Sequence, residues 1–322
     1  MRNDSTIHSR VKIVLLPVFL SLVLVSCAVS DYSCSTTSCE VIPCGPGPED
    51  FALDTLFKRE RLIISSVDRR AEQPGQIQSL DLKTYEVINL DRKHEPESIF
   101  FNPHGLDLIL HPDGKQYLYV ISHEKERELV IKYQVESHHL NFINAFSHPL
   151  FKSLNGITAD GHGGFYVTND NVFSGNIVYC DSQMTCSFIK KGLLFANGLY
   201  LMDSILYVAT TIGNKVHGLS LADNYKSRRI TRVKGGDNFS SINSKLLLAS
   251  HPSYFKFFRH VLKGSRKSPS RVFLIDPENN KKRLLFKDDG SAISASATAL
   301  IYKNHLYISQ VFEPYLLKVK ID

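Results

Sequence analysis

Residues 100–123 read FFNPHGLDLILHPDGKQYLYVISH, the pattern of two β-strands joined by a tight turn. A run that alternates apolar and polar side chains precedes Asp113-Gly114, and a longer apolar run follows it. The Asp-Gly pair readily takes the positive φ angles that a two-residue hairpin turn requires. His104 lies near the start of the first strand and His123 closes the second. Antiparallel pairing is therefore expected to bring the two histidines together.

The same pattern recurs about six times, with a spacing of roughly 40–60 residues and several short strands in each copy, which is typical of a β-propeller. Most copies open on a polar residue that leads into an apolar strand. In chain order these opening residues are Glu49, His104, Asn155, Asn197 and the pair Asp237-Asn238. The sequence therefore predicts an all-β protein that folds as a six-bladed β-propeller.

The opening polar residues suggest a metal site in the central channel. The innermost strand of each propeller blade lines the channel, so these residues are expected at one height around its axis. Two of them are carboxylates and three are amides, and oxygen atoms of this kind are the ligands that Ca²⁺ prefers. Any one of these residues would equally suit the start of a strand after a turn, but their recurrence at one point of the repeat favours a calcium site.

The composition is that of a soluble globular protein, with 43% hydrophobic and 22% charged residues among 322. The net charge is +6, and the lysines and arginines are scattered except for a cluster within residues 256–267. We interpret this cluster as a solvated loop or surface helix, with a nucleic-acid or phospholipid patch as the alternative. No nucleic-acid partner is predicted.

Residues 1–27 have the pattern of a signal peptide. Basic residues precede an apolar run over residues 13–25, which is short for a membrane span. The run ends in Leu-Val-Ser-Cys27, which resembles the lipobox of bacterial lipoproteins, in which the cysteine is lipidated. We predict an exported chain that faces the periplasm from the outer membrane if it is bacterial, and is secreted otherwise. Plain secretion and an uncleaved anchor remain the alternatives to lipidation.

The predicted domains after the signal peptide are a Ser/Cys/Gly/Pro-rich tether over residues 28–48 and the propeller over 49–322. Export permits disulfides. Cys180 and Cys186 bracket a short polar loop and are candidates to staple one hairpin, whereas the pairing of the other cysteines cannot be deduced from sequence. These are Cys34, Cys39 and Cys44.

Common sequence patterns of zinc sites and of α/β-hydrolases do not occur in the sequence. CxxC…CxxC and HExxH spacings are missing, which argues against a zinc site. A G-x-S-x-G motif is also missing, which argues against an α/β-hydrolase.

From about Glu49 to Lys318 the chain resembles the paraoxonase/arylesterase family, six-bladed calcium propellers that hydrolyse lactones and aryl esters. Related gluconolactonase-like and strictosidine-synthase-like propellers generally lack the histidine of the PHG motif. The stretches that carry the resemblance are FFNPHG at 100–105, SLNGI at 153–157, FANGL at 195–199, DN at 237–238, ASHP at 249–252 and VFEPYLLKV at 311–319.

The resemblance implies a role for each matching residue. The ligands of a catalytic calcium would be Glu49, Asn155, Asn197, Asp237 and Asn238. His104 would be the general base, His123 the second catalytic histidine, and His251 a residue of the substrate pocket. The ligands of a second, structural calcium would include Asp50 and the carbonyl of Leu106.

The chain departs from the family at two places. Gly156 stands where the family commonly has an aspartate, which puts the second calcium in doubt. Vertebrate members tie the first and last blades with a disulfide, but no cysteine follows Cys186. Closure of the ring is therefore expected to rest on strand pairing.

The implied activity is calcium-dependent hydrolysis of a small-molecule lactone or aryl ester. Water would attack a carbonyl polarised by the metal, and a histidine would accept the proton. One alternative is a calcium-stabilised propeller that binds a partner without catalysis. Another is a sugar lactonase of the gluconolactonase type with a different divalent metal. The presence of both His104 and His123 favours the enzyme.

Overall fold

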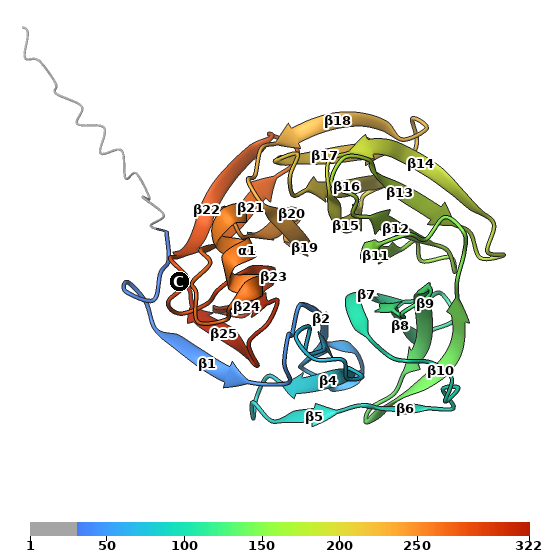
Figure 1. Cartoon of the computed structure of the whole chain (residues 1–322), viewed down its shortest axis with the longest axis horizontal. Coiled ribbons are helices and arrows are strands. Elements are labelled where there is room, and N and C mark those ends of the chain that lie inside the picture. The colour runs from blue at the N-terminus through green and yellow to red at the C-terminus, as the bar shows by residue number, and fades with distance from the viewer. Residues whose placement is uncertain (1–30) are drawn as a thin grey trace, which may run out of the picture. The chain divides into compact units, whose positions relative to one another are not determined.

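The structure, a computed structural model, describes residues 31–322. These residues form six small sheets arranged around a central axis (Figure 1), which confirms the predicted six-bladed β-propeller. The predicted signal peptide and lipobox-like cysteine lie outside the described residues. Within the described part, no helix is both long and apolar enough to cross a membrane.

Each blade is a sheet of consecutive strands that starts next to the axis and ends at the rim. The strands of the first three blades are β2 (Asp50–Asp54), β3 (Arg61–Ser66), β4 (Gln76–Asp81) and β5 (Val87–Asn89); β7 (Pro103–Leu110), β8 (Gln116–His123), β9 (Glu128–Val135) and β10 (His139–Phe146), joined at the rim by β6 (Asp91–Lys93); and β11 (Leu154–Ala159), β12 (Phe165–Asn169), β13 (Gly175–Cys180) and β14 (Cys186–Leu193).

The other three blades follow the same plan. Their strands are β15 (Ala196–Met202), β16 (Ile205–Thr210), β17 (Lys215–Ser220) and β18 (Lys226–Thr231); β19 (Gly236–Ile242), β20 (Lys245–Ser250), β21 (Ser270–Asp276) and β22 (Lys281–Asp288); and β23 (Ser296–Tyr302), β24 (His305–Gln310), β25 (Tyr315–Lys320) and β1 (Cys39–Pro43).

The ring is closed by strand β1, which pairs antiparallel with β25 and so completes the last blade with an N-terminal segment. The register places Cys39 opposite Val319 and Pro43 opposite Tyr315. Main-chain hydrogen bonds therefore close the propeller, as expected for a chain without a disulfide between its first and last blades. Strand β1 lies inside the stretch that the sequence predicted as a tether, so the propeller begins at residue 39.

The described residues contain two disulfides and one free cysteine. Cys180–Cys186 joins the two strands of the β13–β14 hairpin, as the spacing suggested, and Cys34–Cys39 closes a short loop that leads into β1. Cys44 is unpaired. The two disulfides fit the predicted export, whereas lipidation of Cys27 stays a prediction.

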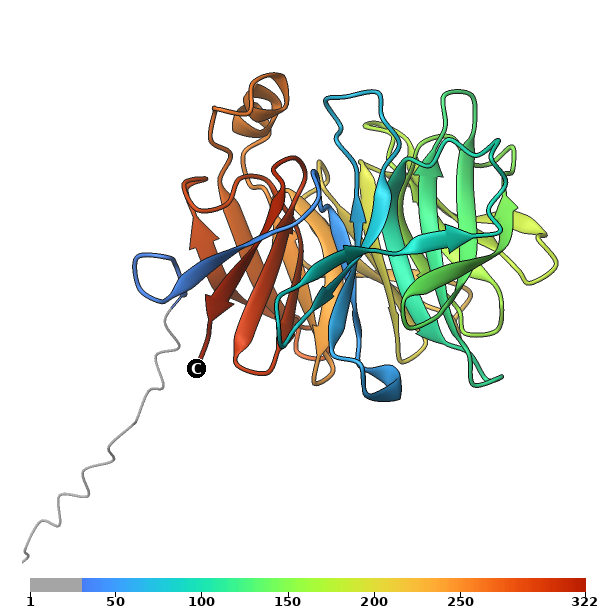
Figure 2. The ribbon, with the colours of Figure 1, turned by 90° about the horizontal axis from the view of Figure 1, so that it is seen from below.

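Two helical segments lie on opposite sides of the propeller. Helix α1 (Tyr254–Leu262) follows β20 and stands above the sheets on the face seen in Figure 1. The short 3₁₀ helix η1 (Leu56–Lys58), in blue, hangs from the other side (Figure 2). The two faces therefore differ, and only the face with α1 carries the histidines described next.

Candidate functional site

The innermost strand of five blades contains a register shift at the place where the sequence repeat begins. On β11, for example, the shift lies between Leu154 and Ile157. Such β-bulges re-aim a side chain that would otherwise follow the regular alternation of the strand. The predicted site residues that lie within these bulges are His104, Asn155, Asn197, Asp237 and Asn238.

Neighbouring inner strands approach one another closely at these bulges. A Cβ added to Gly156 would lie 2.5 Å from the carbonyl oxygen of Asn197, and one added to Gly198 would lie 2.4 Å from the carbonyl oxygen of Asp237. Glycine permits this contact because it has no Cβ. The structure thereby brings the polar residues of consecutive blades side by side around the axis.

The five predicted calcium ligands are all more than nine-tenths buried. Among the described residues, the amide oxygens of Asn155 and Asn197 and the amide nitrogen of Asn238 have no hydrogen-bond partner. Buried polar atoms without partners are rare in proteins, so each calls for an explanation. Two amide oxygens beside the carboxylates of Glu49 and Asp237 fit a calcium ion, which takes carboxylate and amide oxygens together.

The raised pKa values of two aspartates in the channel also fit a bound cation. Burial and the neighbouring Asp50 raise the pKa of Asp237 well above its ordinary range, and burial raises the pKa of Asp50 to about 7. Carboxylates in such surroundings favour either a proton or a bound cation. Between residues 31 and 322 no group of three or more His, Cys, Asp or Glu side chains has metal-binding geometry.

His104 and His123 form a hydrogen-bonded pair, as the hairpin predicted. His104 Nδ1 lies 2.9 Å from His123 Nε2, and His123 Nδ1 lies 2.6 Å from Glu128 Oε2. If the N–H of His123 is at Nδ1, it donates a hydrogen bond to the carboxylate of Glu128. Nε2 of His123 then accepts a hydrogen bond from the N–H at Nδ1 of His104. Nε2 of His104 then carries no hydrogen and presents a lone pair. It has no hydrogen-bond partner among the described residues and lies 3.4 Å from Glu49 Oε1.

The protonation state of His104 follows from its surroundings. Burial, His123 and Arg69 together hold the pKa of His104 well below its ordinary value of 6.5. The imidazole is therefore neutral at pH 7 and able to accept a proton at Nε2. The sequence analysis missed Glu128, although it stands opposite His123 in the β8–β9 register and follows it after a four-residue turn.

His251 lies at the opposite side of the ring. Its Nδ1 is 3.4 Å from Asp237 Oδ2, and its ring stacks on Phe257 of α1 with centroids 4.3 Å apart. Burial lowers the pKa of His251 to about 4. The structure thus places His251 beside Asp237 and against helix α1, whereas its role in the substrate pocket stays a prediction.

Comparison with known proteins agrees with this geometry. The sequence profile named Arylesterase matches residues 64–317. The chain belongs to the arylesterase family. "Serum paraoxonase/arylesterase 1" of Rattus norvegicus is 27% identical over 268 residues, which cover 74% of this chain and 75% of the rat protein. "Serum paraoxonase/lactonase 3" of Homo sapiens is 23% identical over 273 residues, which cover 76% of this chain and 77% of the human protein.

Solved structures of low sequence identity share the architecture. The PQQ-bound aldose sugar dehydrogenase of Streptomyces coelicolor has a TM-score of 0.56 at 12% identity, with 88% of this chain and 98% of that chain covered. A streptogramin B lyase has a TM-score of 0.53 at 9% identity, with the same coverages of 88% and 98%. At this identity the likeness shows the propeller fold alone.

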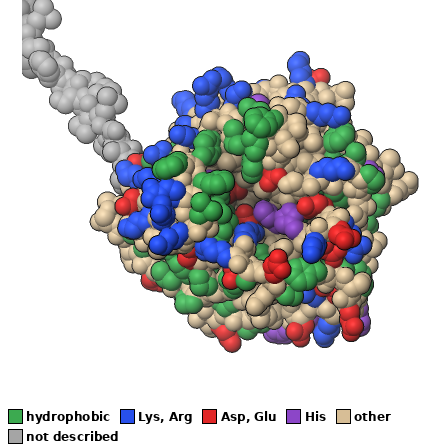
Figure 3. All heavy atoms as spheres, in the orientation of Figure 1, with side chains coloured by type: hydrophobic (Ala, Val, Ile, Leu, Met, Phe, Trp, Pro, Cys, Tyr) green, Lys and Arg blue, Asp and Glu red, His purple; other side chains and the backbone are tan. Residues whose placement is uncertain are grey.

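A hollow of about 680 Å³ opens above the ring. Figure 3 shows histidine side chains in it, on the face that carries α1. Its lining includes His104, His123, Phe100 and Arg69. Arg69 forms an ion pair with Glu49 and is a site residue that the sequence analysis missed. It comes from the β3–β4 loop, outside the repeat, so no pattern marked it.

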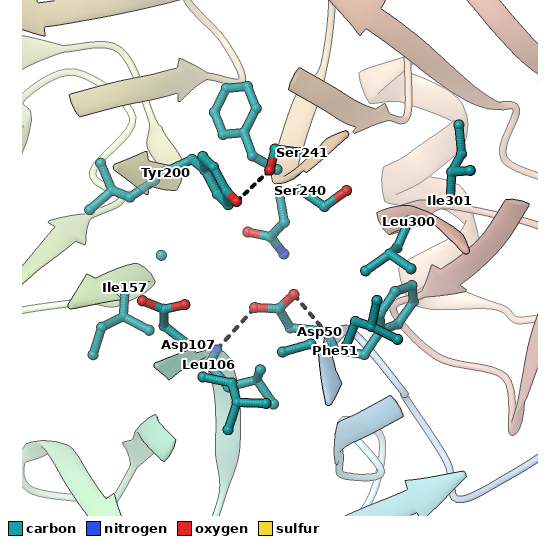
Figure 4. Close-up of a pocket in the computed structure, with 17 residues that line it drawn as sticks. Asp50, Phe51, Leu106, Asp107, Ile157, Tyr200, Ser240, Ser241, Leu300 and Ile301 are labelled. Atoms are coloured by element: carbon teal, nitrogen blue, oxygen red, sulfur yellow. Dashed lines mark hydrogen bonds between the residues drawn. The ribbon is translucent and has the colours of Figure 1, made fainter. Parts of the chain in front are cut away.

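A second cavity, of about 220 Å³, lies along the channel and contains the predicted second calcium ligands. Figure 4 shows the carboxylates of Asp50 and Asp107 directed into the same space. Asp50 accepts hydrogen bonds from the backbone N–H of Leu106 at 2.9 Å and from Thr298 Oγ1 at 2.7 Å. Leu106 therefore contacts Asp50 through its backbone N–H, whereas the family resemblance implied that its carbonyl would be a calcium ligand.

Asp107 is the third site residue that the sequence analysis missed, after Glu128 and Arg69. It accepts a hydrogen bond from the backbone N–H of Ala159 at 2.7 Å, and burial raises its pKa. The charge of Asp107 also contributes to the raised pKa of Asp50. On β7, Asp107 lies two positions after Gly105. Residues two positions apart share one face of a strand, so this alternation was the signal in the sequence from which Asp107 could have been identified.

Proposed function

We propose that the chain is a calcium-dependent hydrolase of lactones and aryl esters. The observation that carries the proposal is the chain of hydrogen bonds from Glu128 through His123 to His104, which leaves a neutral, unpartnered Nε2 beside Glu49. The family and the names of its serum paraoxonase/lactonase relatives support this class of substrate.

The ring residues fit calcium because they combine two carboxylates with amide oxygens that lack partners. The residues that would hold the ion are Glu49, Asn155, Asn197, Asp237 and Asn238. When bound, calcium would polarise the carbonyl of the ester and stabilise the negative charge that develops on its oxygen.

His104 would perform the proton transfers. Its Nε2 accepts a proton from the water that attacks the carbonyl carbon, and the positive charge that develops on the ring is stabilised through His123 by Glu128. The same proton can then pass to the leaving oxygen. In a lactone this oxygen stays attached to the product, so the ring opens to a hydroxy acid.

Hydrolysis of a panel of aliphatic lactones and aryl acetates tests the function. We expect the full chain to hydrolyse members of both groups in saturating calcium and to lose this activity in a calcium chelator. Activity that survives chelation would exclude the calcium-dependent reaction. A chain that binds calcium but hydrolyses nothing in the panel would instead be a calcium-stabilised binding module.

We also propose that Asp107 supplies, together with Asp50, the carboxylates of a second calcium site. Gly156 lacks the carboxylate of the family, and Asp107 offers one in the same cavity. The carboxylates of the buried Asp50 and the half-buried Asp107 share one cavity and repel each other unless a cation or proton lies between them. A bound calcium would relieve this repulsion and would join blades one and two.

Elemental analysis of the purified chain checks the second site. We expect two calcium ions per chain in the parent and one in Asp107→Asn, with a lower melting temperature for the variant. Asp113→Asn is the matched control, because Asp113 is an exposed carboxylate in the turn of the same hairpin. One calcium in the parent, or two in Asp107→Asn, would exclude Asp107 as a ligand.

A further inference from the structure

The side-chain hydroxyl of Thr211, the residue after strand β16, links two blades beside the ring of polar residues around the channel. Its Oγ1 lies 3.1 Å from Nδ2 of Asn197, on the inner strand of the same blade, and 2.7 Å from the carbonyl oxygen of Gly236, on the inner strand of the next blade. Thr211 and Asn197 are each 4% exposed. The proposed mechanism gives Thr211 no task, although it contacts a predicted calcium ligand directly.

The strand register shows that this contact recurs in four consecutive blades. In each of them, the residue before the ring residue pairs with a residue near the end of the second strand, and the residue after that partner contacts the ring residue. The contacts between side-chain polar atoms are His104–His123 at 2.9 Å, Asn155–Asp170 at 3.2 Å, Asn197–Thr211 at 3.1 Å and Asp237–His251 at 3.4 Å. A second layer of side chains thus supports the ring, and Thr211 supplies it in blade four.

The single hydrogen of the Thr211 hydroxyl decides which end of the Asn197 amide faces it. A carbonyl oxygen can only accept, so this hydrogen goes to Gly236, and Oγ1 can then only accept from Asn197. The amide must therefore present its nitrogen to Thr211. Its oxygen, Oδ1, is turned away from Thr211 and has no hydrogen-bond partner among residues 31–322.

Blade three orients its amide in the same way. Asp170 Oδ2 accepts a hydrogen bond from Nδ2 of Asn155, and Oδ1 of Asn155 also has no partner in the part of the chain that the structure describes. The acceptors differ, since one is a carboxyl group and the other is a hydroxyl whose hydrogen is engaged elsewhere. The outcome is the same in both blades, because the amide nitrogen is occupied and the amide oxygen is left for a cation.

We propose that Thr211 is a positioning residue of the ring, whose hydroxyl holds the Asn197 amide so that Oδ1 is available to calcium. This inference rests on the calcium site of the proposed function and adds a residue to it. Removal of a group that orients a metal ligand through a hydrogen bond typically lowers metal affinity by roughly 10–100-fold. Without the hydroxyl, the amide of Asn197 would lose the contact that selects its orientation, and the carbonyl of Gly236 would lose a donor.

The affinity for calcium, measured by isothermal titration calorimetry on the full chain, tests this role without reference to activity. Thr211→Val removes the hydroxyl and keeps the branched shape, so we expect binding at the ring to weaken roughly 10–100-fold. The binding step that Asn197→Ala weakens identifies the ring site in the titration. Thr211→Ser should retain most of the affinity, because the backbone N–H of residue 211, bonded to the carbonyl of Phe195 at 2.9 Å, keeps the serine hydroxyl in place. Thr211→Ala, which also lacks the hydroxyl, takes the place of Thr211→Val if the valine variant does not fold.

Thr210→Val is the matched control. Thr210 is the preceding residue and is 2% exposed. Its Oγ1 also forms hydrogen bonds, but with the carbonyl and the N–H of Lys215 at the start of β17, at 3.1 Å and 3.3 Å. We therefore expect Thr210→Val to lower the melting temperature, because it leaves buried groups without their partner, and to leave the affinity for calcium unchanged.

A double-mutant cycle shows whether Thr211 acts through Asn197. If it does, Thr211→Val should weaken calcium binding in the parent but have little further effect in Asn197→Ala, since the amide that Thr211 orients is then missing. The role of Thr211 would be overturned, while the calcium site stands, by equal losses of affinity in both backgrounds, by equal losses in Thr210→Val and Thr211→Val, or by an unchanged affinity in Thr211→Val. A parent that binds no calcium at the ring would overturn both the site and the role of Thr211.

Discussion

We expect His104→Gln to lower the turnover of every lactone that the parent hydrolyses by about 10²–10⁴-fold, the usual contribution of a general base. Glutamine is polar and of similar length, but it cannot accept the proton that Nε2 of His104 would take from water. His104 is not one of the proposed metal ligands. The affinity for calcium and the melting temperature should therefore stay close to those of the parent.

Two further variants separate this role from a structural one. Glu128→Gln keeps a hydrogen-bond partner for His123 but removes the negative charge that stabilises a protonated His104, so it should lower turnover by less than His104→Gln. His162→Gln changes an exposed histidine on another blade and should have no effect. Full activity of His104→Gln on all lactones would rule out His104 as the base.

Asp237→Asn should change stability in opposite directions with and without calcium. A ligand that binds only the folded state stabilises it by about 2.7 kcal/mol at a hundredfold excess over its Kd, which corresponds to roughly 5 °C in Tm. The variant should lose most of this gain, together with the activity. In chelator, however, the variant should melt at a higher temperature than the parent.

The higher melting temperature expected for Asp237→Asn in chelator follows from the pH dependence of stability. Burial and Asp50 raise the pKa of Asp237 in the folded state, so the folded parent binds a proton that the unfolded chain has already released. Its stability without calcium therefore falls as the pH rises above the ordinary pKa of aspartate, about 3.9. The amide side chain of the variant cannot ionise and avoids this loss.

Thermal melts of the parent and Asp237→Asn, in calcium and in chelator over a range of pH, measure both effects. Asp289→Asn, a change at an exposed carboxylate, is the control and should respond to calcium like the parent. Identical melting curves of the parent in calcium and in chelator would contradict a calcium site in the ring.

The sequence alone determined the fold and the order of the residues around the channel. The strand and turn signals recur in every blade, and each lies within a short stretch of chain, so local patterns were enough to predict six blades. His104 and His123 could be paired because one Asp-Gly turn joins their strands. Asn155, Asn197 and Asp237 could be predicted to lie together because equivalent positions of a repeat lie at equivalent heights along the propeller axis.

Only the tertiary structure decided how the distant parts meet. Strand β1 pairs with β25 across about 280 residues of chain, and nothing in residues 39–43 names that partner. Arg69 reaches Glu49 from a loop outside the repeat, and Asp107 enters the channel beside Asp50. The outer face of α1 is exposed because its other face packs on His251 and Glu313. A local pattern states which side chains share a face, but which face is buried depends on contacts between residues far apart in the sequence, and those contacts form only in the folded chain.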